Sequence, residues 1–475
     1  MSGSSAASRL AASGGVLALA TALLTAASPA GASPEPAFWV SAGGASAGAS
    51  PGCRTAQYTT VQSAVTAAEA QETQRRGFVP AIEICPGTYA EQLTITKSLE
   101  LTAAPAGPNA GPVTIQLPAS VGSGVSTGLS STNCQATDAA NGMQVPQSVI
   151  EICSAGAGGA NTTGVSVAVH GITVTGPWTY QGCYDSWYGI LVGGGASLSL
   201  SNSTVENIEA QPLTGCQGGV GVEIGSAPTS QIGHADLTND TIESYQKNGI
   251  TVDGPGSTAD IDHVVVTGAG PTPTIAQNGI QVSFGATASV TGSTITGDNY
   301  TGAFDASSAG ILAYGGGGAV CGIGTISPLV EHARFTGNTL VGNDIGIALA
   351  NYDPTCTKSV STPTGDIACS NVLQNSHGYP GGTASADANI SGIGTGATAV
   401  GYQAGVSDVG DRDVICDNAI SGAGYAPLDA TSSLPSPPEP AFVRPIDVVS
   451  GEGLGPAIAP QVYGNTFNRS AYRPA

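Results

Sequence analysis

Glu223 and Asp253 are the two acidic residues whose types and spacing most clearly suggest chemistry. Each lies in a short segment that begins with a glycine and alternates with apolar residues. On neighbouring strands of one sheet, offset by two residues, their carboxyl groups would lie about 8 Å apart. That separation suits the acid and base of an inverting hydrolase, or two ligands of a cation such as calcium. Two solvated acids on a strand face are the simpler alternative.

Four further residues on or beside the same segments are candidates for binding a ligand. Polar side chains on rigid strands, with aromatic rings next to them, are what a sugar polymer needs from a groove. We therefore predict substrate contacts for Trp187, Lys247, Gln281 and Tyr314. For an aromatic residue, packing beneath a loop is the alternative.

The elements that must position these residues are six glycine-initiated strands that recur every 28 to 36 residues. Their first residues are Gly189, Gly221, Gly249, Gly279, Gly310 and Gly346. In these strands we expect Ile and Val to point inward, and the glycines and alternate residues to point outward. Stacked strands would then present a flat outer face, long enough to serve as a groove for a polymer.

A second, six-residue pattern recurs in nine copies from Val169 to Phe467, with apolar residues at its first and last positions. Those two positions are five apart, so both can point inward only if the chain bends between them. The third position holds residue types that mostly tolerate positive φ. These predicted corner residues are Gly171, Asn202, Asn239, His263, Gly292, Gly337, Ser370, Asp417 and Gly464.

Three short strands per unit, with turns between them, describe one rung of a parallel β-helix. With 69 Gly and 30 Pro among 475 residues, a helical bundle is excluded. A β-propeller blade needs about 40 residues or more, so most of these units are too short for one. We therefore predict an all-β chain built as a single-stranded solenoid.

The N-terminal part of the chain carries three recognisable segments: Tyr58 to Val65, Ile82 to Glu91 and Lys97 to Leu101. They resemble the opening of pectinesterases and other pectin-lyase-like proteins, which are right-handed parallel β-helices. The resemblance implies an N-terminal capping helix, and Val61, Ala64, Val65 and Ala68 do fall on one helical face. The catalytic motifs of pectinesterases and of β-helical polygalacturonases do not occur here, so the resemblance predicts the fold and leaves the reaction open.

Charge limits the partners. The chain has 33 acidic and 12 basic residues, a net charge of −21, and its three lysines are scattered. Nucleic acid is excluded as a partner because phosphate recognition needs clustered Lys and Arg. A polyanionic glycan would be repelled unless a divalent cation bridged the two. A neutral or esterified polysaccharide is the easier partner.

The N-terminus has the features of a secretory signal peptide, residues 1–32, followed by a flexible tail, 33–53. The remainder, 54–475, is predicted to be one β-helix domain with loop insertions near 314–334 and 374–414. An even number of cysteines after an export signal predicts disulfides. The sequence suggests Cys53 with Cys85, Cys134 with Cys153 and Cys183 with Cys216, without fixing the connectivity. The other cysteines are Cys321, Cys356, Cys369 and Cys416.

Two functions remain open from the sequence. The first is a secreted enzyme, a lyase, hydrolase or esterase, that acts on an extracellular polysaccharide. The second is a non-catalytic secreted or cell-surface β-helix that binds glycan or presents loops. In both cases we expect a monomer without a membrane span, because no segment after the signal approaches the roughly 20 apolar residues that a span needs.

Overall fold

The structure is a computed structural model. It describes residues 38–43, 51–75, 77–105, 111–119, 147–154, 164–178, 187–300, 308–317, 328–353, 360, 362–375, 403–422, 443–448 and 457–467. All of these belong to one compact unit, Ala37–Ala475. The predicted signal peptide, most of the predicted tail, and segments 318–327 and 376–402 of the predicted insertions lie outside the described residues.

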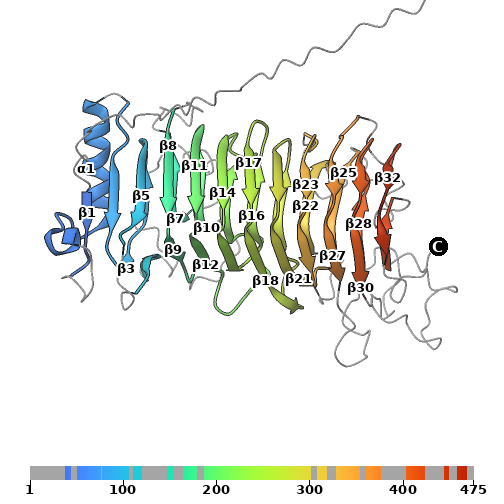
Figure 1. Ribbon diagram of the computed structural model, residues 1–475, viewed down its shortest axis with the longest axis horizontal. Helices are drawn as coiled ribbons and strands as arrows, with labels where there is room; N and C mark the ends of the chain where they lie inside the picture. Colours follow the sequence, from blue (N-terminus) through green and yellow to red (C-terminus); the bar gives the residue numbers. More distant parts are fainter. Residues whose placement is uncertain are drawn as a thin grey trace, which may run out of the picture. The chain divides into compact units, whose positions relative to one another are not determined.

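Three parallel sheets make up this unit, and successive strands of the chain visit them in turn (Figure 1). Sheet 1 contains, in spatial order, β1 (Phe38–Val40), β2 (Ala81–Ile84), β5 (Leu99–Ala103), β8 (Ser166–His170), β11 (Ala196–Ser201), β14 (Gly233–Thr238), β17 (Thr258–Asp262), β20 (Thr287–Thr291), β23 (Arg334–Thr336), β26 (Ile367–Cys369), β29 (Val414–Cys416) and β32 (Gln461–Tyr463).

Sheets 2 and 3 stack their strands in the same direction. Sheet 2 contains β4 (Leu93–Ile95), β7 (Gln147–Cys153), β10 (Trp187–Gly193), β13 (Val220–Gly225), β16 (Asn248–Asp253), β19 (Asn278–Ser283), β22 (Ala309–Gly316), β25 (Ile345–Tyr352), β28 (Gln403–Asp408) and β31 (Val443–Asp447). Sheet 3 contains β3 (Gly87–Ala90), β6 (Val113–Gln116), β9 (Ile172–Thr175), β12 (Thr204–Ile208), β15 (Thr241–Tyr245), β18 (Val265–Thr272), β21 (Thr294–Tyr300), β24 (Thr339–Val341), β27 (Val372–Asn375), β30 (Ala419–Gly422) and β33 (Thr466–Phe467). The chain is therefore a right-handed parallel β-helix, as predicted.

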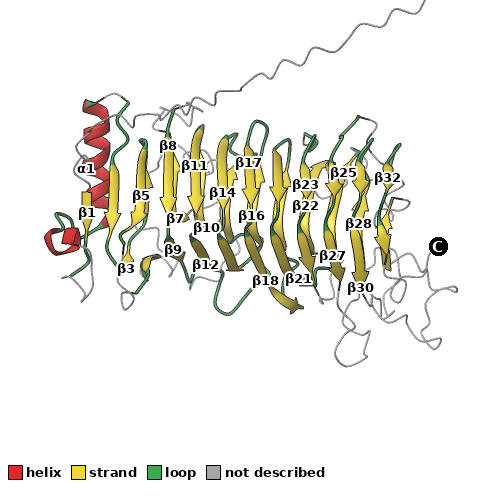
Figure 2. Cartoon of the chain, viewed as in Figure 1, coloured by secondary structure: helices red, strands yellow, loops and turns green. Residues whose placement is uncertain are grey.

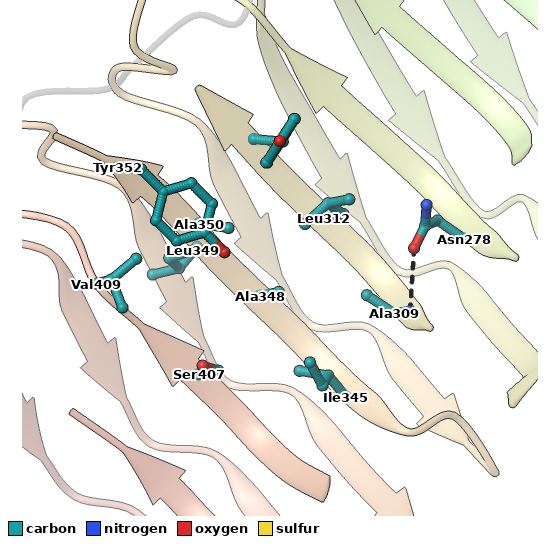
Figure 3. A pocket seen from close by; sticks show the side chains of 11 residues that line it. Asn278, Ala309, Leu312, Ile345, Ala348, Leu349, Ala350, Tyr352, Ser407 and Val409 are labelled. Atoms are coloured by element: carbon teal, nitrogen blue, oxygen red, sulfur yellow. Dashed lines mark hydrogen bonds between the residues drawn. The ribbon is translucent and has the colours of Figure 1, made fainter. Parts of the chain in front are cut away.

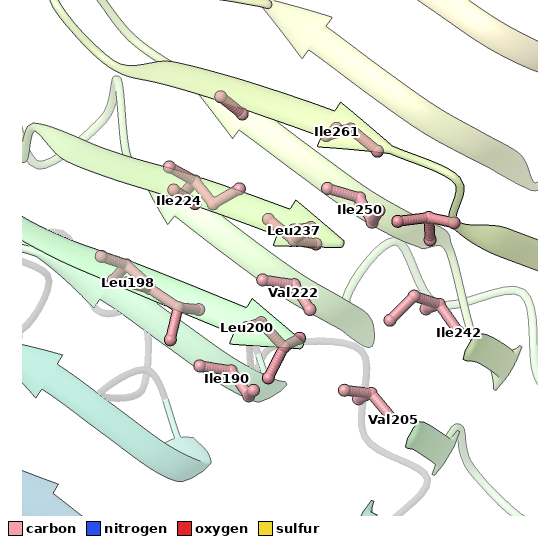
Figure 4. Packing of buried hydrophobic residues seen from close by; sticks show 14 of the residues in the cluster. Ile190, Leu198, Leu200, Val205, Val222, Ile224, Leu237, Ile242, Ile250 and Ile261 are labelled. Atoms are coloured by element: carbon pink, nitrogen blue, oxygen red, sulfur yellow. The ribbon is translucent and has the colours of Figure 1, made fainter. Parts of the chain in front are cut away.

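The predicted corners join sheet 1 to sheet 3, and all nine corner residues have φ between 50° and 69°. Except at the last corner, where Val462 and Phe467 are exposed, the apolar residues that flank a corner point into the shared interior. Leu200, Val205, Leu237 and Ile242 are completely buried there. Figure 4 shows how these side chains from successive rungs stack on one another. The left-handed corner thus lets a strand of sheet 1 and the next strand of sheet 3 bury the same core.

Next to the corners runs a ladder of buried hydrogen bonds that the sequence analysis did not identify. The backbone N–H of Asn338 donates to Oδ1 of Asn371 at 2.9 Å, and that of Asn371 donates to Oδ1 of Asn418 at 2.9 Å. Asn418 repeats the contact with Asn465 at 3.0 Å. Asp240 occupies the equivalent position in an earlier rung, two rungs before the one that contains Ser293. It accepts a hydrogen bond from the N–H of Ser203 at 2.8 Å. Buried N–H groups at the bends are satisfied in this way.

Helix α1 (Val61–Gln74) caps the first rung, as the resemblance implied (Figure 2). Its four predicted core-facing residues are fully buried. Glu91, at the end of the Gly-Thr-Tyr-Ala-Glu segment, accepts hydrogen bonds from the backbone N–H groups of Val61 and Gln62 at 2.8 and 2.9 Å. A carboxylate suits a helix N-terminus because unpaired N–H groups gather there. The short 3-10 helix η1 (Pro51–Thr55) precedes α1.

Two disulfides are described. Cys53–Cys85 is the predicted pair, and Cys369–Cys416 joins register partners on β26 and β29. Cys153 and Cys216 are also disulfide-bonded, and their partners lie outside the described residues. So do Cys134, Cys183, Cys321 and Cys356. Among the described residues no cysteine is free.

Candidate functional site

Glu223 and Asp253 lie on the outward face of sheet 2, on neighbouring strands. Glu223 of β13 pairs in register with Thr251 of β16, and Asp253 follows Thr251 by two residues on the same face. Both side chains are 6% exposed. The alternative of two solvated surface acids is therefore wrong, because both carboxyl groups are largely removed from water.

The structure corrects the position of the glycines. A Cβ atom added to Gly221 would lie 2.5 Å from the carbonyl oxygen of Gly249 and 2.7 Å from Cγ2 of the core residue Ile242. The column of glycines therefore faces the interior bend between sheets 3 and 2, where only glycine fits. It does not flatten the outer face. The residues just before the glycines, Asn248 and Asn278 among them, point outward instead.

Seven side chains of β13, β16 and β19 form what we call the polar face: Glu223, Asn248, Thr251, Asp253, Asn278, Gln281 and Ser283. Asn248 Nδ2 lies 3.0 Å from Oγ1 of Thr251 and 3.2 Å from Oε1 of Gln281, and it donates to both. Asn278 Nδ2 donates to Oδ1 of Asn248 at 3.1 Å.

The network continues to the predicted carboxyl pair. Gln281 Nε2 donates to Oγ of Ser283 at 3.1 Å, and this hydroxyl donates to Oδ1 of Asp253 at 2.8 Å. The other oxygen of Asp253 accepts from the backbone N–H of Ala227 at 2.6 Å. Three amide or hydroxyl side chains, those of Asn248, Gln281 and Ser283, thus connect Asn278 to Asp253 over two strands.

Burial shifts the pKa values of the two acids. It raises the pKa of Glu223 well above the ordinary value; the nearby Asp253 raises it further, while a hydrogen bond with Thr251 opposes the shift. Burial also raises the pKa of Asp253, against the hydrogen bonds from Ala227 and Ser283. Burial therefore favours the uncharged form of both carboxyl groups.

A pocket of about 160 Å³ adjoins the polar face over β22, β25 and β28. Figure 3 shows Asn278 at one side of it and Tyr352 and Val409 at the other. Most of the residues that line it are apolar or aromatic, including Leu312, Tyr314, Ile345, Ala348, Tyr352 and Val409. Asn278 belongs both to the lining and to the polar face, so the two surfaces are continuous.

The other predicted substrate contacts divide into three groups. Gln281 lies on the polar face, and Tyr314 lines the pocket. Lys247 is half-buried beside the face; its ammonium donates to the carbonyl of Ala276 at 2.6 Å, and burial lowers its pKa to about 8. Trp187 does not fit its predicted role, because it is 1% exposed and belongs to the interior core with Trp178.

Calcium does not fit the carboxyl pair well. Both oxygens of Asp253 already accept hydrogen bonds, from Ser283 and Ala227. Within the described part of the chain, no group of three or more His, Cys, Asp or Glu side chains could hold a metal ion. Both oxygens of Asp253 are thus engaged within the protein, and apart from Gln281 the residues of the polar face are at most 6% exposed.

No known protein family and no curated protein matches the chain in sequence. Solved structures do resemble it. The A-module of the mannuronan C-5 epimerase AlgE4 of Azotobacter vinelandii is 11% identical, with a TM-score of 0.43, over 86% of this chain and 84% of that one. The tailspike of E. coli bacteriophage HK620, solved with a pentasaccharide, is 10% identical, with a TM-score of 0.42, over 87% and 63%. The Dettilon tailspike is 14% identical, with a TM-score of 0.44, over 86% and 59%.

These similarities concern the fold alone, because every identity is 14% or lower. The chain spans less than two thirds of each of the two tailspikes. In the described part of this chain, no helix has the length and apolar character needed to cross a membrane.

Proposed function

We propose that this protein is secreted and binds a neutral or esterified extracellular polysaccharide along the polar face of sheet 2. The observation that carries the proposal is the network from Asn278 to Asp253. It fixes amide and hydroxyl groups on rigid strands, so that little side-chain freedom remains to be lost on binding. Sugar hydroxyls both donate and accept hydrogen bonds, and such a face complements them.

Charge supports the choice of a neutral partner. The chain carries a net charge of −21, so a polyanion approaches against a repulsive field. Burial raises the pKa of Glu223 and so favours its protonated form, which can donate a hydrogen bond to a neutral ligand. The disulfides Cys53–Cys85 and Cys369–Cys416 support an oxidising, extracellular setting.

The carboxyl pair supports a second candidate, cleavage of the bound polysaccharide. A protonated Glu223 could donate its proton to a glycosidic oxygen, and an ionised Asp253 could activate water on the opposite side of the sugar. The observation that favours it is the burial of both acids at 6% exposure on neighbouring strands. In this reading Ser283 and Ala227 hold Asp253 in place.

A panel of polysaccharides tests both candidates. The mature protein is titrated with neutral, methyl-esterified and polyanionic polymers, and binding is followed by affinity electrophoresis, with and without calcium. Reducing ends, unsaturated products and methanol are measured on the same samples. We expect retardation by neutral or esterified polymers only, without calcium. Selective binding of polyanions would contradict the proposal, and reducing ends that disappear in Glu223→Gln would establish cleavage.

A further inference from the structure

The outward face of sheet 2 changes character abruptly between β19 and β22. Asn278 pairs in register with Ala309, and Gln281 pairs with Leu312. On β22 and β25 the equivalent positions are apolar, whereas on β28 only Ala404 is apolar and Ser407 is polar. Ala309, Ile345, Ala348 and Ala404 form a small hydrophobic cluster, with Leu312 packed against it. This cluster is separate from the interior core. Apolar residues thus occupy the side of the sheet where the polar face would otherwise continue.

The pocket described above lies over this cluster, and its aromatic walls are held in place. The rings of Tyr314 and Tyr352 meet edge to face, with centroids 5.8 Å apart, and Phe284 packs behind Tyr314 at 5.5 Å. Of the described residues that line the pocket, none is Asp, Glu, Lys, Arg or His. The described lining therefore favours a neutral group with an apolar surface.

We propose that this pocket binds a methyl-bearing substituent of the polysaccharide, an O-acetyl group or the methyl group of a 6-deoxy sugar. The inference rests on the proposed function, because Asn278 lines the pocket and also belongs to the polar face. A sugar chain hydrogen-bonded to Asn248 and Gln281 would place its next unit over the pocket. The volume of about 160 Å³ also leaves room for part of the sugar ring to lie against the tyrosines.

Two pairs of polymers test the proposal and distinguish the O-acetyl group from the methyl group of a 6-deoxy sugar. Acetylated glucomannan is compared with its alkali-deacetylated form, and a polymer of rhamnose is compared with a polymer of mannose. We expect the methyl-bearing member of one pair to bind at least about fourfold more tightly, the factor that burial of one methyl group supplies. A preference in the first pair identifies the acetyl group, and one in the second identifies the deoxy methyl group.

Three variants test whether the preference for the methyl-bearing polymer arises in the pocket. Ala348→Leu fills the pocket, and Leu312→Asn makes its floor polar at similar volume, so either should abolish the preference for the methyl-bearing polymer. Ala419→Leu is the matched control, because Ala419 is exposed on β30 of sheet 3. Melting temperatures show which variants are folded. If Ala348→Leu is not folded, Leu312→Asn alone tests the pocket.

The outcomes distinguish this proposal from the proposed function. Equal binding within both pairs, or a preference that survives in a folded pocket variant, overturns the pocket assignment and leaves glycan binding intact. An absence of binding to all four polymers contradicts the proposed function and the pocket assignment together. Gln281→Ala should weaken binding of both members of a pair by the same factor, since it alters only the polar face.

Discussion

The side-chain amide of Asn278 donates to Oδ1 of Asn248 at 3.1 Å, and this bond joins β19 to β16 within the polar face. Oδ1 of Asn278 accepts in turn from the backbone N–H of Ala309 on β22. Each asparagine is thus held by its neighbour on the adjacent rung. The outer face of sheet 2 is therefore ordered by side-chain bonds that run along the solenoid, in addition to its backbone ladder.

Replacement of Asn278 by alanine should destabilise the protein. Asn278→Ala removes the acceptor of the Ala309 N–H group and the donor to Asn248, which are both buried. A buried polar group without a partner costs about 1–3 kcal/mol, so we expect a loss of that size in the free energy of unfolding by urea. The control is Thr294→Ala on sheet 3, which should change it by less than about 0.5 kcal/mol. Equal effects would contradict a structural role for the network.

Asp240 should make stability depend on pH. Burial raises its pKa to about 6, although the N–H groups of Ser203 and Thr238 oppose the shift. Because the folded pKa exceeds the unfolded value of about 3.9, its contribution to stability is complete below about pH 4 and is lost as the pH rises through 6. Asn338, Asn371 and Asn418 occupy the equivalent position in later rungs.

Asp240→Asn should therefore stabilise the protein at pH 7.5, by on the order of 2 kcal/mol, and change little at pH 4. An asparagine can keep the acceptor for Ser203 without a charge. Urea unfolding at both pH values, for the wild type and the variant, measures the difference. If the gain in stability is the same at pH 4 and pH 7.5, the ionisation of Asp240 is not its cause.

The repeats could be read from the sequence because each corner combines two local requirements. The residue at the bend must accept positive φ, and the apolar residues on both sides must reach one core. All nine corner residues meet the first requirement. The capping helix was implied by the resemblance of the N-terminal segments, and Val61, Ala64, Val65 and Ala68 share one face, as such a helix requires.

The outer face was harder to predict because alternation does not continue through the bend into sheet 2. Tyr188 pairs with Val220 and Ile190 pairs with Val222, whereas the intervening glycines face the interior. Strict alternation would place Asn248 and Asn278 on the inner face. The bend places them on the outer face instead, so the sequence pattern did not identify them as part of the site. Trp187 was misplaced for the same reason: it lies at the bend and packs inward. The asparagines of the ladder are visible in the sequence repeats. Their hydrogen bonds join successive rungs, so the ladder could be recognised only in the structure.

Glu223→Gln should raise the melting temperature at pH 7.5. Burial, with Asp253 nearby, raises the pKa of Glu223 above its unfolded value, so its contribution to stability is full at acid pH and declines as the pH rises toward the folded pKa. Glutamine has the shape of glutamate but does not ionise, so it does not lose this stability as the pH rises. Calorimetry at pH 4 and 7.5, on the wild type and the variant, checks this. A lower melting temperature at pH 7.5 would show that an ionised Glu223 stabilises the fold.

The most direct test of the central claim is the affinity of two matched variants for the best-bound neutral polysaccharide. Gln281→Ala removes a half-buried glutamine from the polar face, and Gln374→Ala removes an exposed outward glutamine from β27 of sheet 3. We predict that Gln281→Ala weakens binding about tenfold, the equivalent of one hydrogen bond of about 1.4 kcal/mol. Gln374→Ala should bind like the wild type. Equal affinities for both variants, or a loss confined to Gln374→Ala, would contradict the assignment of the binding face to sheet 2.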